Sequence, residues 1–261
     1  MRVTLGRVKL VALLSALSAL TVASRLPFLP PRLAHWDAVN YALGLHDFNV
    51  AAHQPHPPGS PYFILLGRAA LSLVGDDNTA LIPGGLTQPE MQLPFEPGRS
   101  WAFTSGPHPG FGSTLPWGAI DFAPPAEKPG CAVSPEWDVA VRAGQVAYSQ
   151  DGIVELDVGG GWTVVYLHVE TRDRAPVGTV VAAGGRLGHP SCEGGEATAA
   201  HLHISRRYNG EWIPADGFAP FVLSGWTVHA GAGPYKGTLT NGDMTIEACS
   251  CANAGTRLQL P

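Results

Sequence analysis

Two histidines separated by one residue, His201 and His203, are the pair whose types and spacing best suit chemistry in this chain. If their apolar surroundings form a β-strand, residues two apart point to the same face. Both imidazoles would then project together above a sheet, while Leu202 and Ile204 would turn into a core. Two neutral imidazoles on one face are half of a zinc site. The alternative is a pair of exposed or core-edge histidines that bind no ligand.

Three further residues could complete such a site. His108 lies between two prolines, and Asp121 follows thirteen residues later in an apolar stretch. His168 lies near the end of the run Trp162–Val169. Taken singly, each has an ordinary alternative: a surface loop residue, half of an ion pair and a satisfied core histidine. We leave His189 out, because the glycine and proline beside it favour a turn.

The segments that must position these residues are expected to be β-strands. The chain holds 32 glycines and 24 prolines among 261 residues, which is typical of a turn-rich β protein. Alternating residues in Trp162–Val169 place Trp162, Val164, Tyr166 and His168 on one predicted face. The other strands are predicted over the following ranges: Trp101–Ser105, Gly144–Gln150, Ile153–Val158, Val180–Gly188, His201–Tyr208 and a hairpin within Gly237–Ala248.

The overall charge excludes one class of function. Only 14% of the residues are charged, and the net charge is −5. A surface that binds the phosphates of nucleic acid would carry a basic excess, so we expect no nucleic-acid partner. The length allows one or two domains, and the oligomeric state is left open.

The N-terminus has the pattern of an export signal. Arg2, Arg7 and Lys9 precede the uncharged apolar run Leu10–Ala23, which ends in an acceptable cleavage site. The same run, extended to Leu29, is barely long enough to span a bilayer as an anchor. Either way the remainder is expected outside the cytoplasm, secreted or tethered to the membrane. The alternative is a buried core helix.

An even number of cysteines in an exported protein suggests disulfides. We prefer the pair Cys131 and Cys192, because these residues flank the candidate site in sequence. Cys249 and Cys251 are separated by one residue, so a bond between them requires a tight geometry. The spacing is not that of a zinc ribbon, so disulfides are favoured over zinc bound by cysteine.

Taken together in this order, the candidate residues resemble the lysostaphin/LytM-type zinc endopeptidases, which cut peptides of bacterial peptidoglycan. The resemblance covers about residues 95–225. The thirteen-residue spacing of His108 and Asp121 resembles the β-lytic endopeptidase subgroup, in which an inserted loop separates the first two ligands. The resemblance implies one zinc ion per chain held by His108, Asp121 and His203, with His168 and His201 lining the site as catalytic residues.

The resemblance also implies a fold and a reaction. The fold is an antiparallel β-sheet peptidase domain with a substrate groove, mainly β and preceded by a hydrophobic helical segment. A zinc-activated water would hydrolyse a peptide bond in a stem peptide or a glycine-containing cross-bridge. The alternative is a non-catalytic cell-wall-binding or hydrolase-activating module that uses the same groove. It would follow if zinc were absent or if a loop, such as the inserted segment 109–120, blocked the groove.

Residues 1–80 resemble a different family, the multi-pass glycosyltransferases that use lipid-linked sugars. An apolar run is followed by a loop with Asp37, which matches a catalytic aspartate, and by a proline-rich entry into Tyr62–Val74. That second run is short and contains Arg68, so we expect it not to cross a membrane unaided. We interpret 1–80 as a remnant without sugar transfer, followed by a linker 81–94, the peptidase domain 95–225 and a β-hairpin extension 226–261.

Overall fold

The computed structural model describes residues 43, 45–48, 61–74, 86–113, 115–125, 130–217 and 219–259. Helix α3 (Pro61–Val74) is the described part of the expected helical N-terminal segment. The predicted export signal and Asp37 lie outside the described residues. None of the helices in the described ranges has the length and apolar character required to span a bilayer.

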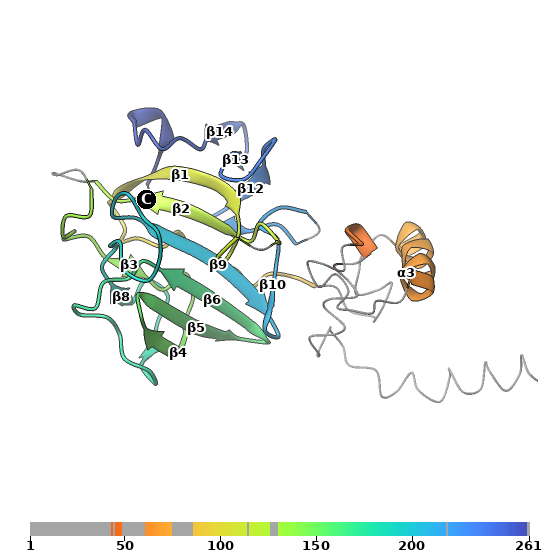
Figure 1. Ribbon diagram of the computed structural model, residues 1–261, viewed down its shortest axis with the longest axis horizontal. Helices are drawn as coiled ribbons and strands as arrows, with labels where there is room; N and C mark the ends of the chain where they lie inside the picture. The colour runs from red at the N-terminus through yellow and green to blue at the C-terminus, as the bar shows by residue number, and fades with distance from the viewer. Residues whose placement is uncertain are drawn as a thin grey trace, which may run out of the picture.

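The rest of the described chain is mainly antiparallel β-structure, as the sequence predicts (Figure 1). The main sheet has the order β15-β1-β2-β9-β6-β5-β4-β7, and β10 pairs with β9. Its strands are β1 (Ser100–His108), β2 (Ala119–Ala123), β4 (Gly144–Gln150), β5 (Ile153–Gly159), β6 (Trp162–Leu167), β7 (Val180–Val181), β9 (Leu202–Tyr208), β10 (Glu211–Trp212) and β15 (Arg257–Gln259).

Two smaller sheets accompany the main one. The first has the order β11-β12-β13-β14 and contacts β1, as the blue strands beside β1 in Figure 1 show. The second pairs β3 with β8. Their strands, with a short 3-10 helix near the C-terminus, are β11 (Val222–Leu223), β12 (Trp226–Ala230), β13 (Gly237–Asn241), β14 (Met244–Glu247), β3 (Asp138–Val139), β8 (Arg186–Gly188) and η3 (Ala254–Thr256).

Alternate side chains of β9 point to opposite faces of the sheet, one toward the apolar core and the other toward the candidate site, as expected from the sequence. Leu202 and Ile204 are 0% exposed and belong to the main apolar cluster. Burial of each such side chain stabilises the fold by about 1.5–3 kcal/mol. His203, which lies between them, faces the other side of the sheet. The division of the chain at residues 80, 94 and 225 stays a prediction.

A buried arginine links β9 to the chain segments behind it. Arg206 lies on the core side of β9, and its guanidinium donates to the carbonyl groups of Pro214, Ala219 and Pro220 and to the side chain of Gln88. Burial lowers the pKa of Arg206 to about 9. The acceptors around Nη1 and Nη2 compensate for much of the cost of removing this group from water, although Nε is buried without a partner among the described residues.

Asp138 places a carboxyl group in the protein interior. Its side chain is 0% exposed, and neither carboxylate oxygen has a hydrogen-bond partner within the described ranges. Burial raises the pKa of this carboxyl well above its ordinary value. Folding therefore favours the protonated form, and the stability that this group contributes is complete at acid pH and lost as the pH rises.

We expect Asp138→Asn to gain stability relative to the wild type as the pH is raised from 4 to 8, by at least about 1 kcal/mol. Denaturant unfolding across this range measures the difference. Asp243→Asn, at an exposed position, is the control and should follow the wild-type curve. Parallel pH profiles for Asp138→Asn and the wild type would contradict the prediction.

Candidate metal centre and catalytic cleft

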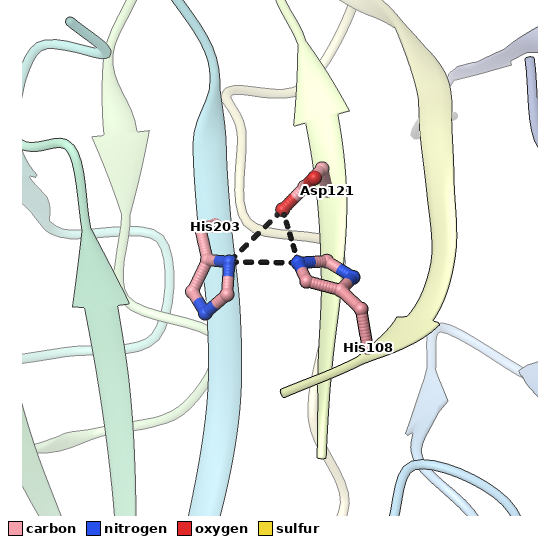
Figure 2. Close-up of side chains that lie close together, drawn as sticks. All are labelled: His108, Asp121 and His203. Atoms are coloured by element: carbon pink, nitrogen blue, oxygen red, sulfur yellow. Dashed lines mark hydrogen bonds and ion pairs between the residues drawn. The ribbon is translucent and has the colours of Figure 1, made fainter. Parts of the chain in front are cut away.

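The side chains of His108, Asp121 and His203 meet on three neighbouring strands, β1, β2 and β9 (Figure 2). His108 Nε2 lies 2.9 Å from His203 Nδ1. Asp121 Oδ1 lies 3.3 Å from the first of these nitrogens and 3.2 Å from the second. All three side chains are buried. The three residues that the sequence analysis names as metal ligands therefore lie within contact distance of one another.

Strand register explains why Asp121 and His203 face each other. The two residues are directly paired in the antiparallel ladder between β2 and β9. Directly paired residues project their side chains to the same face of the sheet. Leu167 of β6 pairs with His203 on its other side and contributes an apolar neighbour.

His108 reaches the same face through an irregularity in β1. Ser105 pairs with Asp121, but His108 rather than residue 107 pairs with Ala119, so β1 contains an extra residue. Such a bulge re-aims the side chains that follow it. Pro107 has no N–H group to donate to a ladder, and a strand tolerates it at a bulge. Without the extra residue, His108 would point to the core.

The second nitrogen of each imidazole is bonded to a backbone carbonyl. His108 Nδ1 lies 2.8 Å from the oxygen of Gly106, and His203 Nε2 lies 3.0 Å from the oxygen of Gly110. A carbonyl only accepts, so each of these nitrogens carries the proton and donates. The lone pairs of His108 Nε2 and His203 Nδ1 are thereby directed at the centre of the cluster.

The electrostatics of the cluster favour a cation. Burial alone would raise the pKa of Asp121, but the imidazoles of His108 and His203 outweigh it and hold the pKa of this carboxyl well below its usual range. Burial lowers the pKa of His108, whereas Asp121 and the carbonyl of Gly106 raise it, and the net shift is upward. Asp121 Oδ1 is buried and has no hydrogen-bond partner among the residues that the structure describes.

These donors fit a divalent metal ion. Two nitrogen lone pairs that face each other at 2.9 Å repel unless a proton or a cation lies between them. A tetrahedral zinc with bonds of about 2.0–2.1 Å separates its ligand atoms by about 3.3 Å. The three atoms lie within 4.8 Å of one another, which allows such an ion with little movement.

His168 and His201 lie beside this cluster, with ring centroids 4.4 Å apart. His201 Nε2 is 3.9 Å from Asp121 Oδ2, and the ring of His168 is 6.2 Å from that of His203. Burial, together with the nearby imidazole of His201, lowers the pKa of His168 to about 4. His168 is therefore neutral at physiological pH.

The predicted face of His168 is wrong. The alternation of the sequence places it with Tyr166, which is buried in the core. Strand β6 instead ends at Leu167, and His168 takes a left-handed backbone conformation with φ of 69°. This turn directs the imidazole into the cleft, where its Nδ1 lies 2.8 Å from the carbonyl oxygen of Glu193.

The five residues line a cleft of about 1230 Å³. One wall is the loop 194–200, which consists mainly of glycine, alanine and threonine. This loop follows a disulfide between Cys131 and Cys192, which confirms the preferred pairing. Cys249 and Cys251 are also bonded to each other.

The sequence analysis missed Tyr235, which stacks on His108 with ring centroids 4.5 Å apart. Its backbone N–H donates to the oxygen of Pro107, and its carbonyl accepts from Gly106. A Cβ on Gly106 would come within 2.4 Å of the backbone of Lys236, so this close approach requires glycine. No local signal reveals a contact across more than a hundred residues of chain.

The chain is similar to bacterial proteases over much of its length. It is 32% identical to Protease LasA of Pseudomonas aeruginosa over 143 residues, which are 51% of this chain and 33% of that protein. It is 28% identical to the Beta-lytic metalloendopeptidase of Achromobacter lyticus over 177 residues, covering 65% and 42%. The same-named protein of Lysobacter enzymogenes matches at 28% over 161 residues, covering 59% and 84%.

The chain thus spans about a third of the length of the Pseudomonas protein. Among solved structures, Pseudoalterin, an M23 metalloprotease from the deep sea, has a TM-score of 0.54 and 21% identity, covering 62% of this chain and 96% of that one. This likeness shows a shared fold. No family model matches the chain. None of these relatives supports the glycosyltransferase resemblance of residues 1–80.

The disulfide between Cys131 and Cys192 is expected to stabilise the folded state. Cys131 and Cys192 are 61 residues apart, and closing a loop of that length stabilises the folded state by up to about 4 kcal/mol. We expect the double variant Cys131→Ser, Cys192→Ser to lose most of this free energy in denaturant unfolding. The matched control is Cys249→Ser, Cys251→Ser, which opens a loop with a separation of 2. Equal losses for the two variants would contradict the expectation.

Proposed function

We propose that this member of the M23 metallopeptidases, of the LasA, β-lytic and lysostaphin type, is a zinc-dependent endopeptidase that hydrolyses peptides of bacterial peptidoglycan. The observation that carries the proposal is the buried cluster of His108 Nε2, Asp121 Oδ1 and His203 Nδ1 on the floor of a cleft. The names of the relatives, a protease and a metalloendopeptidase, agree with it.

We assign His108, Asp121 and His203 as the ligands of one zinc ion per chain. Two neutral imidazoles and one carboxylate leave the ion a net charge near +1 and one coordination position for the reaction. When bound, zinc supplies a Lewis acid that activates water at neutral pH and polarises the scissile carbonyl group. The chain itself supplies the buried surroundings and the carbonyl groups that orient both imidazoles.

His168 and His201 are the proposed catalytic residues. Peptide hydrolysis requires a proton to leave the attacking water and another to reach the departing amine. Both rings line the cleft within reach of its floor, and the neutral His168 has its Nδ1 proton committed to the carbonyl of Glu193. Its other nitrogen is therefore available to a substrate. Either ring can also stabilise the developing oxyanion.

The cleft and the cysteines support the proposed substrate and the proposed location. Apart from Glu196, the wall formed by residues 194–200 presents small side chains, so an extended peptide can approach the backbone closely. Peptidoglycan stem peptides or glycine-containing cross-bridges fit this wall. Two disulfides favour a location outside the cytoplasm, because such bonds persist in oxidising compartments. Anchorage in a membrane has no support among the described residues.

Removal of the metal tests the proposal. We expect purified full-length protein to contain one zinc per chain by elemental analysis and to release new amino termini from peptidoglycan. A chelator should abolish this release, and added zinc should restore it. His203→Ala should lose both the metal and the activity. A folded wild type that binds zinc but leaves the substrate intact would instead favour a cell-wall-binding module.

Substitution of the two cleft histidines separates catalysis from metal binding. We expect His168→Ala and His201→Ala each to lower kcat about 10²–10⁴-fold while the zinc content stays at one per chain. Neither residue belongs to the buried ligand cluster, so the metal should remain. Elemental analysis of each variant serves as the control. Full activity in both variants would remove these residues from the mechanism.

A further inference from the structure

The two ends of the segment between His108 and Asp121 contact β10 and the chain that follows it. Its C-terminal end is attached to the chain that follows β10, because Ala215 N–H donates to the oxygen of Trp117 at 2.9 Å. A Cβ on Gly118 would lie 2.9 Å from the oxygen of Ile213, so the two backbones are in close contact. The inserted segment is thus packed on the β9–β10 hairpin.

The N-terminal end of this segment carries Gly110, whose carbonyl oxygen lies 3.0 Å from His203 Nε2. A Cβ on Gly110 would lie 2.8 Å from Cε3 and 3.0 Å from Cζ3 of Trp212. The backbone of Gly110 therefore lies directly against the indole ring. Any side chain at position 110 would move either the ring or the carbonyl.

Trp212 is itself held by charged neighbours on the same face of the sheet. Trp212 of β10 pairs with Arg207 of β9, whose guanidinium lies 3.9 Å from the centroid of the indole ring. Arg207 Nη1 donates to Glu155 Oε1 of β5 at 2.8 Å. Residues 203 and 207 of β9 share one face because they are four apart in a strand. The indole ring is therefore held between Arg207 of β9 and the backbone of Gly110, whose carbonyl oxygen lies against His203 Nε2.

We propose that Trp212 is a positioning residue for His203: its indole holds the Gly110 carbonyl where it accepts the Nε2 proton and directs Nδ1 at the metal. The inference rests on the proposed function, because it assigns His203 as a ligand. A carbonyl that binds the outer nitrogen of a ligating histidine fixes its tautomer and its orientation, and the loss of such a partner typically lowers metal affinity about 10–100-fold.

Zinc affinity of the full-length protein, measured by competition with a chromogenic chelator, tests the proposal. We expect Trp212→Ala and Gly110→Ala each to raise the Kd for zinc about 10–100-fold. Trp212→Phe, which keeps an aromatic ring, should restore most of the affinity. In a Trp212→Leu background, the added methyl group of Gly110→Ala should cost less affinity than in the wild type, because the colliding ring atoms are absent.

Trp137→Ala is the matched control. Trp137 is also partly buried and also lies beneath an arginine, Arg186, whose guanidinium is 4.5 Å from its ring. It packs on His189 rather than on Gly110, with ring centroids 3.8 Å apart. Its removal should leave the Kd for zinc unchanged. A folded Trp212→Ala that binds zinc as tightly as Trp137→Ala would overturn the proposal while leaving the proposed function intact.

A second readout does not depend on metal binding. Nitrogen-15 NMR of the metal-free protein at pH 8 reports which nitrogen of His203 carries the proton. We expect protonation at Nε2 in the wild type and in Trp137→Ala, and a mixture of both tautomers in Trp212→Ala and Gly110→Ala. An unchanged tautomer in both variants would overturn the positioning role. Failure of the wild type to bind zinc would overturn the proposed function instead.

Discussion

The pairing of β2 with β9 is the constraint on which the site depends. It sets Asp121 opposite His203, and a slip of one residue would turn one of them to the other face. The core prevents such a slip, because the alternate positions of both strands are apolar and fully buried. These positions are Ile120, Phe122, Leu202 and Ile204. The energy that holds the ligands in register therefore comes from the opposite side of the sheet.

Burial of a carboxylate costs free energy unless nearby groups compensate for the loss of water. For Asp121 of β2, the compensating groups are imidazoles on the two neighbouring strands, β1 and β9. The imidazoles of His108 and His203 keep the pKa of Asp121 low in spite of its burial. That effect requires a proton on the nitrogens that face Asp121. Without it, two nitrogen lone pairs and one carboxylate oxygen without a hydrogen bond face one another, and this arrangement suits a cation. The facing lone pairs that destabilise the cluster without a cation are therefore the groups that can bind a metal ion.

Around the cluster, the orienting groups are backbone carbonyls rather than side chains. The carbonyl of Gly106 is held through Tyr235, that of Gly110 lies against Trp212, and that of Glu193 follows the disulfide at Cys192. Three separate segments, one of them the bulged end of β1, therefore converge on three histidines. Because a carbonyl is common to all residues, its role leaves no signature in residue type.

The sequence by itself determined most of the long strands and the five polar residues of the cleft, but the predicted run Val180–Gly188 is divided between β7 and β8, which belong to different sheets. Alternation and turn chemistry are local, and the order of the five residues carried the family resemblance that predicted the metal site. Only the tertiary structure decided the bulge that turns His108 to the cleft, the left-handed backbone that turns His168 there, and the contacts of Tyr235 and Trp212. Each of these depends on close approach between segments far apart in the chain, which no local pattern of residues records.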